Sequence, residues 1–177
     1  MIQQFIGFGR RLASASGPTQ QNTLFSPNNM SSNTAPSPFV ASADTNQASY
    51  PPWEAFDGVN TDSGGGNGWR PTNTSLPHWI KLDIGSGNTQ YCYTYKITVR
   101  SDASADKPTS WTLAGSNDDS SYTTVDTQTS VTWSGGAGEE KTFTCADPTV
   151  GAYRYWKLNV TAAQSNDFYI QEVKLYN

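Results

Sequence analysis

Short segments in which polar and apolar residues alternate run through most of the chain, and turn residues separate them. In Tyr153–Thr161, for example, Trp156, Leu158 and Val160 fall on one side of an extended backbone, while Tyr155 and Lys157 fall on the other. His78–Gly85 alternates in the same way. The same pattern predicts strands within further segments: Ser31–Pro52 around Phe39, Tyr91–Arg100, Ser110–Ala114, Tyr122–Asp126, Glu140–Cys145 and Phe168–Tyr176. About eight short strands and no amphipathic helix predict an all-β fold, an antiparallel sandwich or flattened barrel.

The composition agrees with this fold class and excludes several functions. Only 15% of the 177 residues are charged and 12% are aromatic, which is typical of a turn-rich β protein. The net charge of -4 gives no overall basic footprint for nucleic acid or an anionic membrane. The chain has no stretch of about eighteen apolar residues, so no membrane span is predicted. Two cysteines and one histidine are too few for a four-ligand zinc site. Cys92 and Cys145 are expected as buried free thiols, with a bridge between them left open.

The first 29 residues differ from the rest. They contain the pair Arg10-Arg11 and then a polar run, so we predict a leader at 1–29 without a stable fold and a β-sandwich domain at 30–177. The apolar residues Ile2, Phe5, Ile6 and Phe8 suit docking on another protein chain, and a leader without any partner is the equal alternative. The arginines follow the apolar residues, so the segment is not a convincing signal peptide.

The stretch Trp53–Asp62 is the most distinctive loop. Asp57-Gly58 is a strong turn signal, and Ala55 and Phe56 should anchor the loop in the core. Asp57, Asp62 and nearby carbonyls would offer hard oxygen ligands of the kind that Ca²⁺ prefers. The alternative is a surface turn in which these side chains bond their own backbone.

Several segments resemble a known family. Lys107–Asp126 is similar to the middle of discoidin-type domains, also called coagulation-factor type C domains, which overlap the family-32 carbohydrate-binding modules. The resemblance extends to Ala55–Gly58, Trp79–Gly85, Tyr153–Val160 and Ile170–Tyr176, and so covers about residues 30–177. It implies an antiparallel jelly-roll-like sandwich of about eight strands, whose loops at one end bind a sugar or lipid head group.

The resemblance also implies a structural Ca²⁺ or Na⁺ site. Its ligands would be the carboxylates of Asp57 and Glu172, Thr61 or Asp62, and three carbonyls, those of Glu54, Val59 and Gln171. This chain departs from the family pattern after Gly58, which leaves the middle ligand open. Lys174 is two residues from Glu172 on an expected strand, so an ion pair between them is the rival arrangement.

Sugar recognition requires an aromatic face and a few fixed polar groups. Loop positions suggest these candidates: Trp69, Arg70, His78, Arg100, Trp133, Asn166 and Phe168. For Trp69 the alternative is core packing, for His78 burial with one hydrogen bond, and for Arg100 a salt bridge with Asp102. Trp133 lies in a Ser/Gly loop that gives a large ring little local reason to be there.

Catalysis has little support, because no nucleophile-elbow or phosphate-loop pattern surrounds the Ser, His and Asp residues. We therefore expect a non-enzymatic carbohydrate-binding or adhesion module. A decoration or fibre subunit of a large assembly, without sugar binding, is the alternative from another class. Because the leader is not a convincing signal peptide, a virion surface protein, for example of a bacteriophage, or an extracellular protein would suit the chain.

Overall fold

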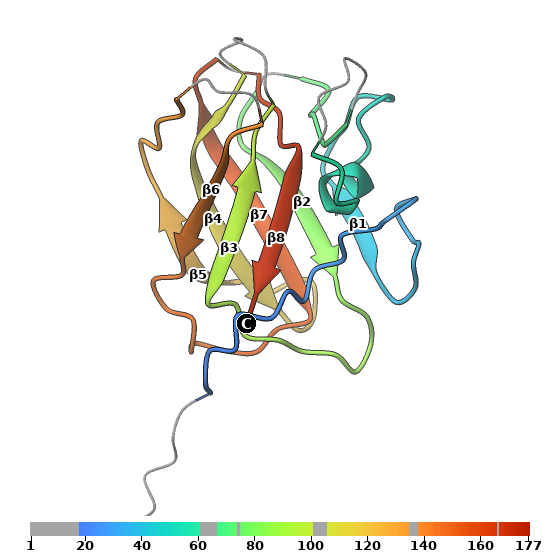
Figure 1. Ribbon diagram of the computed structural model, residues 1–177, viewed down its shortest axis with the longest axis vertical. Helices are drawn as coiled ribbons and strands as arrows, with labels where there is room; N and C mark the ends of the chain where they lie inside the picture. Colours follow the sequence, from blue (N-terminus) through green and yellow to red (C-terminus); the bar gives the residue numbers. More distant parts are fainter. Residues whose placement is uncertain (1–17, 61–66, 74, 101–105, 135–137, 166) are drawn as a thin grey trace, which may run out of the picture.

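A computed structural model describes residues 18–60, 67–73, 75–100, 106–134, 138–165 and 167–177. These residues form eight strands and one 3-10 turn (Figure 1). The elements in chain order are β1 (Val40–Ala43), η1 (Pro52–Phe56), β2 (His78–Asp83), β3 (Thr94–Thr98), β4 (Pro108–Ser116), β5 (Thr123–Gln128), β6 (Glu140–Thr144), β7 (Tyr155–Ala163) and β8 (Glu172–Tyr176).

The strands form two antiparallel sheets. One sheet has the order β1-β2-β7-β4-β5, and the other has the order β6-β3-β8. In Figure 1 the three-stranded sheet lies in front of the larger one, with η1 beside them. The all-β antiparallel sandwich expected from the alternating segments is therefore confirmed.

The alternation places apolar side chains between the sheets. In β2, Ile80 and Leu82 are buried while Trp79 and Lys81 are half-buried. In β7, the buried residues Trp156, Leu158 and Val160 alternate in the same way with half-buried ones. The core joins these residues to apolar side chains of the other strands: Tyr95, Ile97, Trp111, Leu113, Val125, Val173 and Leu175.

A buried polar bridge joins the two sheets within this core. The hydroxyl of Tyr95, on β3, donates to Asp126 Oδ2 on β5 at 2.6 Å. The same hydroxyl oxygen accepts from Trp111 Nε1, on β4, at 2.8 Å. Burial raises the pKa of Tyr95, and its hydrogen bond to Asp126 adds to this rise, so the phenol stays a donor.

The segment before β1 belongs to the sandwich, which corrects the predicted boundary at residue 29. Backbone bonds from Gln21 N to Asn177 O and from Phe25 N to Leu175 O tie this segment along the edge of β8. Ser26 Oγ accepts from the Leu175 N–H at 3.0 Å, and Met30 is buried in the core. The sequence of this segment has no strand pattern that would predict the pairing, because its backbone hydrogen bonds are made with the free edge of β8. The apolar positions proposed for docking lie within residues 1–17, outside the described residues.

Cys92 and Cys145 are both buried and unbridged, as expected. Burial raises the pKa of Cys92 well above its ordinary value, and Cys145 beside it acts in the same direction. Within the described ranges, no helix is long and apolar enough to cross a membrane.

We expect Tyr95→Phe to lower the free energy of unfolding by about 2–3 kcal/mol, because Asp126 and the Trp111 N–H each lose a buried partner. Urea denaturation measures the loss. Tyr93→Phe is the matched control, because it removes a hydroxyl that donates to the Pro18 carbonyl at the surface. That change should cost less than about 0.5 kcal/mol. Equal losses in the two variants would show that the bridge contributes nothing.

Candidate functional site at the η1 end of the sandwich

η1 packs near the start of β8, at the end of the sandwich opposite the C-terminus (Figure 1). Three carboxylates of this region, those of Glu54, Asp57 and Glu172, influence one another, because the Asp57 charge adds to the burial that raises the pKa of the other two. Glu54 lies in η1, Asp57 directly follows η1, and Glu172 begins β8. Pro51 and Pro52 start the short helical turn, and Gly58, in the loop that follows it, has a positive φ of 77°. A Cβ at Gly58 would lie 2.2 Å from the Asn28 carbonyl oxygen, so the close packing of this loop requires glycine.

Glu172 is on the outer face of its sheet, yet it is fully buried. The loop after η1 covers it, and the Gly58 N–H donates to Glu172 Oε2 at 3.0 Å. The other carboxylate oxygen, Oε1, has no hydrogen-bond partner within the described part of the chain. Lys174 bonds Glu140 Oε2 at 3.0 Å instead. The rival Glu172–Lys174 ion pair is therefore not formed, although the Lys174 charge still opposes the rise in the Glu172 pKa.

The electrostatics of this cluster follow from burial. Burial raises the pKa of Glu172 to about 8, and the Asp57 charge adds to the rise. Burial raises the pKa of Glu54 to about 7, against a hydrogen bond from the Gly68 N–H at 3.2 Å. The pKa of Asp57 is raised for the same reason, although its Oδ1 accepts from Val59 N at 2.8 Å. The cluster therefore holds more negative charge than its surroundings favour.

The donor set fits a hard cation. Beside the unpartnered Glu172 Oε1, Gln171 Oε1 is also buried without a hydrogen-bond partner among the described residues. Two such oxygens next to like-charged carboxylates are what a bound Ca²⁺ would satisfy. In the described ranges no three His, Cys, Asp or Glu side chains form a metal-holding group by themselves. Carbonyl and amide oxygens would therefore complete any site. The expected ligand Asp62 lies outside the described residues.

Two arginines lie near a pair of tyrosines, Tyr50 and Tyr169, and Tyr169 is close enough to Glu54 for that acid to add to the rise that burial causes in the Tyr169 pKa. Arg70 follows the bridge between Trp69 and Ile170, and its Nε donates to Asp167 Oδ2 at 3.1 Å, with Nη2 bonding the same carboxylate. These bonds raise the pKa of Arg70, and Asp106 and Tyr50 act in the same direction.

The second arginine completes the arrangement. Arg100 Cζ lies 5.2 Å from the centre of the Tyr169 ring, and Tyr50 packs edge-on against Tyr169 with centroids 4.9 Å apart. Tyr169 is buried, whereas Tyr50 and both arginines are half-buried. We call Tyr50, Arg70, Arg100, Asp167 and Tyr169 the arginine–tyrosine cluster. It offers fixed donors and an aromatic surface in one place.

Other sequence-predicted sugar contacts lie in the core, which corrects those predictions. Trp133 is 8% exposed and its Nε1 donates to the Pro108 carbonyl at 2.7 Å, so the ring has a structural reason to be in its loop. Phe168 is fully buried and packs edge-on against the buried ring of Trp69, with centroids 5.3 Å apart. His78 is also buried, where Nδ1 lies 2.7 Å from Asp44 Oδ2.

Of the remaining candidates, Arg70 and Arg100 belong to the cluster, and Asn166 lies outside the described residues. Sequence reasoning missed Tyr50, Asp167 and Tyr169. Asp167 and Tyr169 flank the chosen Phe168, and an alternating reading of that segment would have placed them together on the other face.

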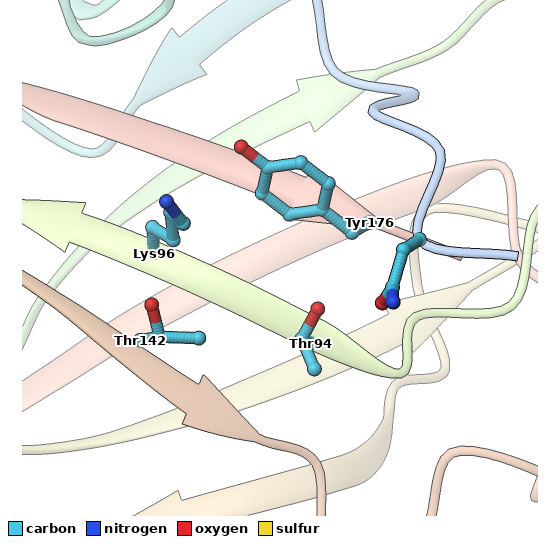
Figure 2. A pocket seen from close by; sticks show the side chains of 5 residues that line it. Thr94, Lys96, Thr142 and Tyr176 are labelled. Carbon is cyan, nitrogen blue, oxygen red and sulfur yellow. The ribbon is translucent and has the colours of Figure 1, made fainter. Parts of the chain in front are cut away.

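A separate hollow of about 280 Å³ lies on the outer face of the three-stranded sheet. Figure 2 shows Tyr176, Thr94, Lys96 and Thr142 projecting into it from three neighbouring strands, and Asn22 completes the lining. The Lys96 ammonium already bonds Glu140 Oε1 at 2.8 Å. This hollow therefore offers one ring, several hydroxyls and a lysine that is already paired with a carboxylate.

Comparisons with known proteins agree with the sequence resemblance. The model of the F5/8 type C domain matches residues 38–173. The family 32 carbohydrate-binding module of Clostridium perfringens NanJ, solved with galactose, is 22% identical and has a TM-score of 0.60, covering 78% of this chain and 93% of that one. Chitosan-binding module 1 from a Paenibacillus sp. IK-5 chitosanase/glucanase is 22% identical, with a TM-score of 0.61 and coverage of 88% and 99%.

A variant of the lectin-binding domain of lectinolysin, solved with Lewis b, is 16% identical, with a TM-score of 0.64 and coverage of 90% and 99%. At these identities the likeness shows the fold. No curated protein sequence matches the chain significantly.

In the presence of a chelator, the free energy of unfolding should fall as the pH rises from about 4.5 to about 8. Over this window the folded chain keeps a proton on Glu172 that the unfolded chain has released, so the slope is negative. The total fall should be on the order of 3 kcal/mol. Glu172→Gln should remove the part of the fall that Glu172 supplies, because the amide keeps an oxygen acceptor for the Gly58 N–H and does not titrate. Glu54, whose pKa is raised to about 7, supplies a further part with the same sign. Urea titrations at pH 5, 6, 7 and 8 measure the profile, and an equally steep fall in Glu172→Gln and in the wild type would show that Glu172 does not contribute to it.

Proposed function

Because the chain belongs to the F5/8 type C domain family, whose model matches residues 38–173, we propose that it is a non-catalytic glycan-binding module. The observation that carries this proposal is the arginine–tyrosine cluster, in which Asp167 and Tyr169 hold two arginines at one end of the sandwich. Solved neighbours of the same fold were captured with galactose and with Lewis b, which supports a glycan as the ligand class.

The cluster has the chemistry that a sugar requires. The Arg70 guanidinium is fixed by its fork to Asp167, so its remaining N–H groups are oriented before a ligand arrives. Tyr50 adds a half-buried ring beside it, and a ring of this kind can stack on the apolar side of a pyranose. Fixed donors and a fixed ring reduce the entropy lost on binding.

A binding role also fits the carboxylates better than hydrolysis does. Glycoside hydrolysis needs two carboxyl groups that face a substrate across a cleft. Here Glu172 is fully buried beneath the loop after η1, and Glu54 accepts a bond from the Gly68 N–H. We therefore propose that these acids have a structural task and not a catalytic one.

The structural task that we propose is to hold a Ca²⁺ ion. Asp57 and Glu172 would supply carboxylate oxygens, and Glu54, Val59 and Gln171 would supply carbonyl or amide oxygens. The unpartnered oxygens of Gln171 and Glu172 support this assignment. The ion would offset the repulsion among the acids and tie the loop after η1 to the start of β8.

Wider roles stay predictions. They are display on a virion or outside the cell, docking of another protein chain on residues 1–29, and service as a structural subunit without sugar binding. None of them is needed for the glycan proposal.

We expect Arg100→Gln to weaken glycan binding about tenfold with an unchanged melting temperature, because a charge-assisted hydrogen bond contributes roughly 1.5–3 kcal/mol. A glycan array on the native protein selects the ligand, and calorimetry then measures the affinity. Arg70→Lys should act in the same direction, because lysine keeps the charge but loses the fork.

Tyr176→Ala, in the hollow of Figure 2, is the matched control and should leave the affinity unchanged. Loss of binding in Tyr176→Ala alone would move the site to that hollow. Full affinity in both arginine variants would remove the arginine–tyrosine cluster from consideration.

We expect Ca²⁺ at about a hundredfold over its Kd to stabilise the fold by roughly 2.7 kcal/mol, which raises the melting temperature by roughly 5–10 °C. Asp57→Asn should abolish this response while it keeps an oxygen that can accept from Val59 N. Asp147→Asn, which changes an exposed acid, is the matched control and should respond like the wild type. Identical wild-type melts with Ca²⁺ and with chelator would mean that no ion is held.

A further inference from the structure

The outer face of the five-stranded sheet carries a second concentration of rings and charges. Lys81 on β2 and Lys157 on β7 are directly paired in the sheet register. Trp79 and Tyr155 extend from the same outer face of these strands, as the burial pattern shows. The side chains around the two lysines line a hollow of about 170 Å³: Trp79, Lys81, Asp119, Tyr122 and Lys157. We call these five residues the sheet-face hollow.

The side chains that line this hollow carry more positive than negative charge. Lys81 Nζ lies 2.6 Å from Asp119 Oδ2, and Arg154 Nη2 lies 2.7 Å from Asp83 Oδ2. Lys157 has no carboxylate within ion-pair distance in the described part of the chain, and its Nζ lies 3.5 Å from the centre of the Tyr122 ring. The lining of the hollow therefore holds two cations, Lys81 and Lys157, and one carboxylate, Asp119, although the whole chain has a net charge of -4.

Lys157 is placed where a bound anion could form an ion pair with it. Burial lowers the pKa of Lys157, and the neighbouring charge of Lys81 lowers it further, against the opposite effect of Asp119. An anionic group beside Lys157 Nζ would supply the missing partner at a partly enclosed place, where ion pairs are screened less than at an open surface. The hollow thus favours an anion, although the chain as a whole is acidic.

The rim of the hollow is held in place by its turn. Ser116 Oγ accepts from the backbone N–H groups of Asp118 and Asp119, at 3.2 and 3.0 Å. Asp118 Oδ1 accepts from the N–H groups of Ser120 and Ser121, at 2.9 and 2.8 Å. Asp119 and Tyr122 bond each other beside these contacts. The acid and the ring are therefore positioned before any ligand binds.

We propose that the sheet-face hollow binds one sugar residue that carries a carboxylate, with the carboxylate on Lys157 and the sugar ring against Trp79 and Tyr122. Its volume is below the roughly 300–1,000 Å³ of sites for drug-sized ligands, which suits a single residue of a longer chain. Asp119 is placed to accept from a sugar hydroxyl. This site lies apart from the arginine–tyrosine cluster, and so goes beyond the function proposed above.

The test compares trigalacturonate with neutral trigalactose by calorimetry on the full chain at low salt. Lys157→Gln should weaken trigalacturonate binding about tenfold and leave trigalactose unaffected, because one charge-assisted contact is lost. Lys141→Gln is the matched control. It also removes a lysine that lies over an aromatic ring, that of Trp133 at 5.6 Å, but on the other sheet. Its affinity for trigalacturonate should stay within about twofold of the wild type.

Several outcomes would overturn the proposal. One is that the wild type does not bind trigalacturonate, and another is that both lysine variants lose affinity for it equally. A third is a loss of affinity in Arg100→Gln without a loss in Lys157→Gln, which would place the acid at the arginine–tyrosine cluster. A change of sedimentation coefficient in Lys157→Gln alone would make the face a self-association surface instead. If the protein bound no neutral glycan, the effect of Lys157→Gln on trigalacturonate binding could still be measured. The two proposals can therefore fail independently of each other.

Discussion

The hydroxyl of Tyr95 is the polar contact that relates the two sheets to each other. Apolar side chains pack without fixed direction, whereas Tyr95 must meet Asp126 and the Trp111 indole at 2.6 and 2.8 Å. Tyr95 thereby fixes β3 over β4 and β5. The pairing of β3 then places Glu172 beside Thr98, and Glu140 on its other side. Lys174 lies two β3 pairs further along, opposite Lys96, and bonds Glu140. Glu172 instead accepts a hydrogen bond from the loop after η1.

Strand alternation was enough to predict the fold. Each of the eight expected segments overlaps a strand, and the inward residues of β2 and β7 are those that alternation selects. The boundary at residue 29 failed for a physical reason. The segment around Phe25 has no pattern of its own, because its backbone bonds are supplied by the far edge of β8, about 150 residues later. Pairing of this kind is a property of two segments and cannot be read from one.

The candidate site was less predictable, because position in a loop does not state the direction of a side chain. Trp133 and Phe168 look exposed in the sequence, yet both turn inward, and Trp133 finds a carbonyl for its N–H. Arg70 and Arg100 stay half-buried, because a guanidinium keeps contact with water while its stem packs. The family resemblance implied that Asp57 and Glu172 lie close together. The sequence did not show that Glu172 is fully buried and accepts a hydrogen bond from the loop after η1.

The short helical turn η1 lies in the chain between Tyr50 of the arginine–tyrosine cluster and the acid Asp57. Tyr50 directly precedes the prolines that start η1, and Glu54 lies within it, with its N–H bonded to the Pro51 carbonyl at 3.2 Å. The Tyr50 ring packs on Tyr169, whose pKa is raised by burial first and also by Tyr50 and Glu54. On the proposed assignment, an ion held by Asp57 and Glu172 would anchor η1 and so restrict the movement of Tyr50. A ligand that binds Tyr50 and a cation that binds Asp57 would then favour the same ordered loop, and each would raise the affinity for the other.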